Sequence, residues 1–162
     1  MGSLVPVTIA GVPIHVLVVH VVVVLIPLAA LGVIAIAFVP RWREKYGALV
    51  AVVTFVAVAS VPVASQTGEG LRPFVAPSPA VANHAQIGGA LKFFAIPLLL
   101  AALALWWMGR KERRNQPYGR GLTMTVGIVS VIVALAAGAW VVRVGHSAAE
   151  AVWGSVVTTT SG

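Results

Sequence analysis

The chain has 162 residues, of which 59% are hydrophobic and 9% are charged, and its formal net charge is +7. Its mean hydropathy of +0.99 excludes a water-soluble globular protein, so we expect a single integral membrane domain over residues 1–162. The absence of cysteine excludes disulfides, thiolate metal sites, iron–sulfur clusters and covalently attached haem, which leaves His, Glu and Met as candidate metal ligands.

Four apolar segments are each long enough to cross a bilayer, which requires about 20 residues in a helix. These segments lie at about 12–39, 46–67, 84–108 and 121–150. They lack the two-residue alternation of barrel strands, so the sequence predicts an all-α integral membrane protein, a bundle of four transmembrane helices. Pro27, Pro62 and Pro97 each fall inside a segment and are expected to kink three of the four helices.

Two short basic loops are expected, at 40–46 between the first and second helices and at 109–120 between the third and fourth. Together they hold eight Lys and Arg residues, whereas the loop at 68–83 holds Arg72 alone. Because basic loops stay on the cytoplasmic side, we expect these two loops inside and both termini outside the plasma membrane. The positive charge then serves topology and contact with the lipid bilayer, and not nucleic-acid binding.

All four histidines are expected on the outer side of the membrane domain. His15 and His20 lie in the first helix, His84 at the start of the third and His146 at the end of the fourth. His15 is expected near the headgroups, where water can satisfy it. His20 lies about 7.5 Å deeper along the helix, where an unpartnered polar side chain costs a few kcal/mol. We therefore expect His20 to face the interior of the bundle.

One interpretation of these residues is a b-type haem, with His20 as one axial ligand and His84 or His146 as the other. Gly88, one turn from His84, would leave room for the flat macrocycle, and Arg143 is a candidate partner for a propionate. This interpretation predicts non-covalent haem b binding and membrane electron transfer.

A second interpretation is a non-haem metal ion, because imidazole and carboxylate ligands suit zinc, iron, copper or manganese. The candidate ligands are His20, His84, His146, Glu69 and Glu150. A third interpretation is structural, with histidines in helix–helix hydrogen bonds of a homo-oligomer or of an accessory subunit in a larger respiratory complex. No nucleophile with a well-placed base is recognisable, which argues against catalytic activity of the protein itself.

Four sequence motifs resemble those of a family of small bacterial four-helix membrane proteins, domain of unknown function 2231. The motifs are "GVPIHVLVVH" opening the first helix, "QTGEGL" closing the second, "NHAQIG" opening the third and "VRVGHSAAEAVWG" closing the fourth. The resemblance covers nearly the whole chain and implies the four-helix membrane fold. In some actinobacterial relatives such a domain is joined to a Rieske-type iron–sulfur domain, which implies a redox membrane partner.

Overall fold

The computed structural model describes residues 8–9 and 11–160, so parts of the expected 1–162 domain at both ends lie outside the described residues. The described chain forms a two-stranded hairpin followed by long helices. The elements are β1 (Thr8–Ile9), β2 (Val12–Pro13), α1 (Ile14–Phe38), α2 (Pro40–Leu71), the 3-10 helix η1 (Arg72–Phe74), α3 (Pro79–Ala90), α4 (Lys92–Arg113) and α5 (Arg120–Thr160). Four helical stretches in this part of the chain are long and apolar enough to cross a membrane, which confirms the predicted fold class.

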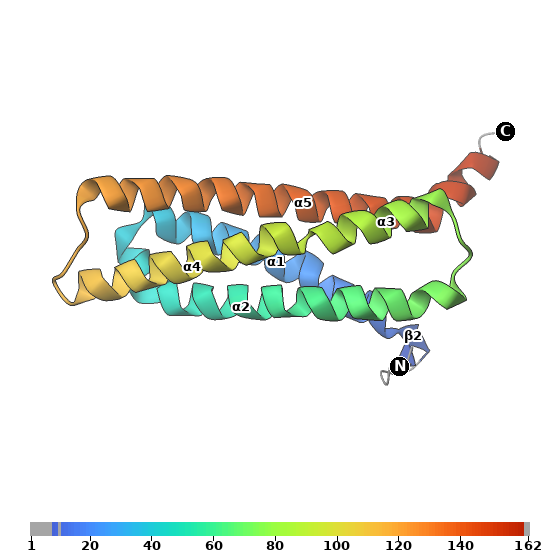
Figure 1. Cartoon of the computed structure of the whole chain (residues 1–162), viewed down its shortest axis with the longest axis horizontal. Helices are drawn as coiled ribbons and strands as arrows, with labels where there is room; N and C mark the ends of the chain where they lie inside the picture. Colours follow the sequence, from blue (N-terminus) through green and yellow to red (C-terminus); the bar gives the residue numbers. More distant parts are fainter. Residues whose placement is uncertain (1–7, 10, 161–162) are drawn as a thin grey trace.

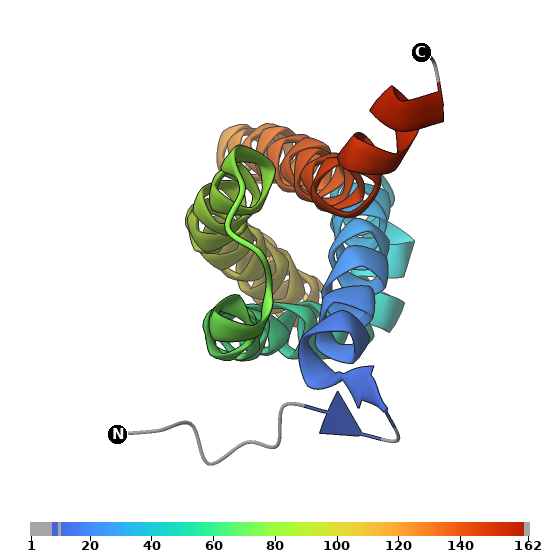
Figure 2. The ribbon, with the colours of Figure 1, turned by 90° about the vertical axis from the view of Figure 1, so that its right-hand side faces the viewer.

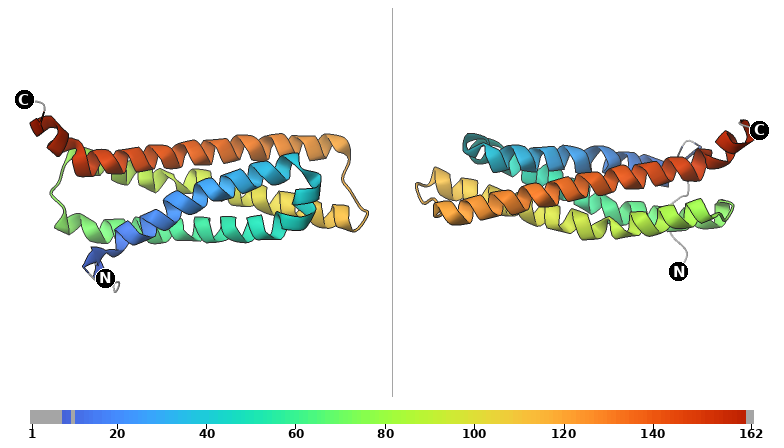
Figure 3. Two further views of the ribbon diagram at one scale, coloured as in Figure 1. Left: turned by 180° about the vertical axis from the view of Figure 1, so that it is seen from behind. Right: turned by 90° about the horizontal axis from the view of Figure 1, so that it is seen from above.

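The four crossings run up and down through one bundle, with α3 and α4 together forming the third (Figure 1). The β1–β2 hairpin, the end of α5 and the connection from α2 to α3 lie at one end, which we call the histidine end (Figure 1). The connections from α1 to α2 and from α4 to α5 lie at the other end, which we call the basic end (Figure 1). Seen along the bundle, α1 stands opposite α3, and α2 stands opposite α5 (Figure 2). Seen from behind, α1 runs obliquely between α5 and α2 (Figure 3).

The interior is built from small and branched apolar side chains. Fully buried examples occur on all four crossings: Ile26, Val33, Ala57, Leu98, Leu105, Ala134 and Ala137. The opposite helix faces are equally apolar, with Val24, Leu31, Phe55, Leu100 and Ile132 exposed. A helix that is apolar on all sides is typical of a membrane span, where small interior residues let helices approach each other.

The first basic segment is helical, so the predicted loop at 40–46 is wrong. Only Val39, in an extended conformation, separates α1 from α2. Pro40 occupies the first turn of α2, where the missing N–H has no helical partner to lose and the fixed φ suits the helix. The loop expected at 68–83 is also shorter, because α2 continues to Leu71 and α3 begins at Pro79.

The proline positions do not interrupt the helices. α1 continues through Pro27, α2 continues through Pro62, and Pro97 lies within α4. The third crossing is interrupted at Leu91, directly after Gly88, Gly89 and Ala90. Glycine weakens a helix by about 1 kcal/mol relative to alanine. Gly88 and Gly89 therefore indicate the position of this break better than Pro97 does.

A buried ion pair and close helix packing join α2 to α4 at the basic end. Arg43 donates from Nε to Glu112 Oε2 at 3.0 Å and from Nη2 to Oε1 at 2.6 Å. The two side chains are 2% and 15% exposed. A Cβ at Gly109 would lie 2.6 Å from the Arg43 carbonyl oxygen, so only glycine allows this approach of the two helices.

We predict that Arg43→Ala lowers the free energy of unfolding by about 3 kcal/mol, because it leaves the Glu112 carboxylate buried without its partner. Glu112→Gln should cost less, and the double variant should cost less than the sum of the two single changes. Unfolding titrations in mixed detergent micelles measure all three. Additive costs would contradict a direct interaction between the two side chains.

Candidate functional site

His15 and His84 face each other across the interior at the histidine end. They come from α1 and α3, which stand on opposite sides of the bundle (Figure 2). Their ring centroids are 6.4 Å apart, and the ring planes meet at 72°. Both rings are half-buried and lie nearer the bundle end than the apolar core, which begins at Val22 on α1 and Ile87 on α3. We call these residues the His15–His84 pair.

His15 is held from α2. Its Nδ1 lies 3.1 Å from the carbonyl oxygen of Ala64 and 3.5 Å from the hydroxyl of Thr67. A Cβ at Gly68 would lie 2.9 Å from His15 Cε1, so the absence of a side chain at Gly68 makes the space that the imidazole occupies. The last turns of α2 therefore provide both an acceptor and a recess for His15.

His84 is held from α5. Its Nδ1 lies 3.0 Å from the hydroxyl oxygen of Ser147. That hydroxyl, which is buried, donates its own hydrogen to the carbonyl oxygen of Val144 at 2.8 Å. Because the Ser147 hydrogen is already used, Ser147 must accept the hydrogen carried by His84 Nδ1.

These contacts fix the same tautomer in both neutral rings. Ala64 offers His15 only a carbonyl acceptor, and Ser147 acts as an acceptor toward His84, so each Nδ1 carries the hydrogen. Each Nε2 then has a free lone pair. A histidine whose Nδ1–H is bound to an oxygen, with Nε2 free, has the usual arrangement of a histidine that ligates a metal.

The prediction that His20 faces the interior is wrong. His20 is exposed on the lipid side of α1, and its Nδ1 donates to the carbonyl oxygen of Val16 at 2.6 Å. His15 and His20 differ by about 140° around a helix, so only one of them can point inward. The bond to Val16 satisfies one ring nitrogen of His20 within its own helix, which lowers the cost of its position in the membrane.

The other candidate ligands do not join the His15–His84 pair. His146 and Glu150 form a pair on α5 with 3.2 Å between Nε2 and Oε1, and their side chains are 75% and 55% exposed. Glu69 is exposed on α2. No group of three or more His, Cys, Asp or Glu residues suited to a metal occurs in 8–9 and 11–160. The five ligands expected for a non-haem metal are therefore not brought together.

The candidate haem neighbours Gly88 and Arg143 lie on different helices, α3 and α5. A Cβ at Gly88 would meet no atom within 4 Å, so there is open space beside the helix one turn from His84. Arg143 is exposed, and its guanidinium lies over the Trp140 ring, 5.3 Å from the centroid. Arg143 is thus engaged with an aromatic side chain at the surface of α5.

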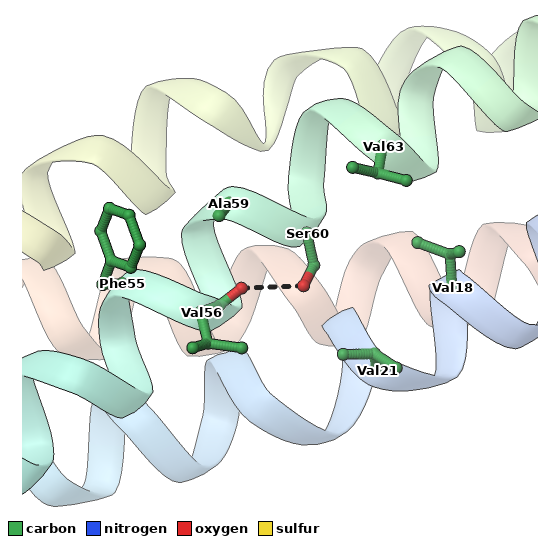
Figure 4. Close-up of a pocket in the computed structure, with 7 residues that line it drawn as sticks. All are labelled: Val18, Val21, Phe55, Val56, Ala59, Ser60 and Val63. Atoms are coloured by element: carbon green, nitrogen blue, oxygen red, sulfur yellow. Dashed lines mark hydrogen bonds between the residues drawn. The ribbon is translucent and has the colours of Figure 1, made fainter.

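A shallow groove on the bundle surface is separate from the histidines. Val18 and Val21 of α1 line it together with residues of α2 between Phe55 and Val63 (Figure 4). Its one hydroxyl, on Ser60, donates to the carbonyl oxygen of Val56 in the same helix. The groove offers apolar surface and no free polar group among these side chains, so it carries no chemistry.

The structure shows why His15 and not His20 points inward, in the spacing of the interior face of α1. The sequence alone does not mark this face, because both faces of α1 are apolar. The buried residues Val22, Ile26, Ala29 and Val33 follow His15 at intervals of a helical stripe. Extending this stripe toward the start of the helix selects His15 and excludes His20. Depth in the membrane was the weaker criterion, because it does not depend on the face of the helix.

We predict that Gly68→Ala displaces the His15 ring and breaks its bond to Ala64, while the unfolding midpoint changes little because alanine favours the helix. The ¹⁵N chemical shifts of the His15 imidazole should show the loss of the pure Nδ1–H tautomer. Gly138→Ala is the matched control, since a Cβ there meets nothing within 4 Å. Unchanged His15 shifts in Gly68→Ala would refute the packing role of Gly68.

No curated protein and no solved structure matches this chain significantly. A family model described as a predicted membrane protein, DUF2231, matches residues 11–161. The match covers β2, both ends of the bundle and all four crossings. The chain therefore belongs to the DUF2231 family of membrane proteins.

Proposed function

We propose that this membrane protein binds haem b through His15 and His84 and serves in electron transfer at the membrane. The observation that carries the proposal is the His15–His84 pair: two imidazoles that face each other across the bundle, each with Nδ1 bound to an oxygen and Nε2 free. Cofactors of helix bundles are commonly held by side chains from facing helices.

The spacing of the pair supports ligation from two opposite sides of one metal. Two metal–nitrogen bonds of about 2 Å, with about 1 Å from each nitrogen to its ring centroid, separate the centroids by about 6 Å. The observed separation is 6.4 Å. Two ligands about a tetrahedral ion would bring the rings closer, so the distance favours the opposed arrangement of axial ligands. His15 and His84 would together hold the iron, and haem held in this way would supply electron transfer better than substrate binding.

The packing of α3 supports the insertion of a flat group near the pair. α3 packs mainly against α5 and only lightly against α2. Open space lies beside Gly88, one turn from His84, where an added Cβ would meet nothing within 4 Å. The chemistry that haem would supply is a one-electron change at iron, with the electron provided and accepted by redox partners in the membrane.

A single metal ion held by the same pair is the second candidate. Ile87 and Leu91 fill the interior one and two turns deeper than His84, and an ion needs less room there than a macrocycle. Two neutral imidazoles with free Nε2 atoms suit zinc, copper, nickel or iron, with water completing the coordination.

We further propose that the protein lies in the plasma membrane with its basic end in the cytoplasm and its histidine end outside. Eight Lys and Arg residues in 40–46 and 109–120 support this orientation, against Arg72 alone in the connection at the other end. The proposed centre would then exchange electrons at the outer side of the membrane.

The first test is a dithionite-reduced minus oxidised absorption spectrum of protein expressed with ample haem and purified in detergent. We expect a sharp α band in the unsubstituted protein. His15→Ala and His84→Ala should each abolish it, because each removes one axial ligand. His20→Ala is the matched control and should keep the band, since His20 lies on the lipid face.

Elemental analysis of the same samples separates the two candidates. A bound metal without an α band, present in equimolar amount and lost in both His15→Ala and His84→Ala, would overturn the haem proposal and support the single ion. The absence of both haem and metal would overturn the proposed function.

The orientation can be tested by labelling, because the natural chain has no cysteine. Ala76→Cys, in the connection before α3, should react with a membrane-impermeant maleimide in right-side-out vesicles. Gln116→Cys, in the connection before α5, should react only after the membrane is permeabilised. The reverse pattern would contradict the proposed orientation.

A further inference from the structure

The break in the third crossing leaves the carbonyl of Ile87 without its usual helical partner, the N–H of Leu91. At Leu91 the N–H donates to the carbonyl oxygen of Gly88 at 3.1 Å and not to that of Ile87, four residues back. Helical hydrogen bonding resumes at Ala95, whose N–H donates to Leu91 O at 2.9 Å. In a membrane a freed carbonyl must be satisfied from within the protein.

Trp140 of α5 satisfies this carbonyl. Its Nε1–H donates to Ile87 O at 3.1 Å. Its ring stacks on Phe94, with centroids 4.3 Å apart and planes at 18°. Ile87 belongs to α3 and Phe94 to α4, so one indole contacts the chain on both sides of the break.

This contact determines where α3 lies relative to α5, and therefore where His84 lies. Ile87 is three residues after His84, on the next turn of α3. The other polar tie of α3 to α5 in the described chain is the bond from His84 to Ser147, which belongs to the pair itself. α3 packs only lightly on α2 and has few contacts with α4, so those helices constrain it little.

We infer that Trp140 is a positioning residue, which holds His84 opposite His15 by clamping the two helical segments on either side of Leu91. The inference depends on the proposed function only for the identity of the group that the His15–His84 pair binds. The clamp itself follows from the hydrogen bond to Ile87 and the stacking on Phe94. The indole N–H is the specific element, because a phenyl ring at 140 would still stack but would leave the Ile87 carbonyl free.

The test measures the distance between α1 and α3 directly. The cysteine-free chain allows spin labels at Val16→Cys and Ala85→Cys, two exposed positions next to His15 and His84. Double electron–electron resonance on this pair should give one narrow distance distribution. Adding Trp140→Phe should broaden or shift it, because α3 loses its tie to α5.

Trp107→Phe is the matched control. It makes the same chemical change at the basic end, where Trp107 Nε1 donates to the Tyr118 hydroxyl at 3.2 Å. It should leave the α1 to α3 distribution unchanged. Phe94→Leu, which keeps the indole N–H and removes the stacking partner, should broaden the distribution less than Trp140→Phe does. An unchanged distribution in Trp140→Phe, or equal broadening in Trp107→Phe, would overturn the inference.

A second readout links the clamp to the bound group. Trp140→Phe in the otherwise natural chain should weaken haem binding roughly tenfold in a haem titration, as substitutions behind a metal ligand do. Unaltered haem affinity would overturn the role of Trp140 in positioning His84. If the unsubstituted protein binds no haem, that result overturns the proposed function and not the clamp. The distance measurement between α1 and α3 then decides whether Trp140 positions His84.

Discussion

Within a bilayer, a polar group that does not reach water has to find its partner inside the protein, and this constraint accounts for most of the specific contacts in this bundle. His15 bonds to a carbonyl of α2, and His84 bonds to Ser147 on α5. Trp140 bonds to the carbonyl freed at the break after Ala90. Almost every other interior contact joins apolar side chains, which other apolar side chains of similar volume could replace. These hydrogen bonds, in contrast, specify which helix faces which.

The two ends of the bundle are built differently. At the basic end, glycine allows α4 to approach the backbone of α2, and the Arg43–Glu112 pair closes the contact. At the histidine end the apolar core stops before the helices do, and half-buried imidazoles occupy the space. One end is thus closed by packing and a fixed ion pair, while the other presents nitrogen lone pairs.

The number of crossings, their helical nature and the family were predictable from the sequence, because hydropathy and motif order do not depend on packing details. The ligand assignment was not, because depth along α1 favoured His20, whereas the face of the helix selects His15. The hydrogen-bond acceptor of His15 cannot be recognised in the sequence either. It is the backbone carbonyl of Ala64, and every residue type carries such a carbonyl. Nothing in the sequence distinguishes Trp140 from other aromatic residues, because the partner of its N–H is the Ile87 carbonyl freed by the break at Leu91.

The junction between α1 and α2 consists of Val39 alone. With so short a link, neither helix can settle in the bilayer far ahead of the other during synthesis. They are expected to leave the translocation machinery together as a helical hairpin, already packed along their lengths. His15 would then meet the Ala64 carbonyl and the Gly68 recess before α3 has been made, so half of the histidine pair is assembled early and His84 arrives at a preformed partner.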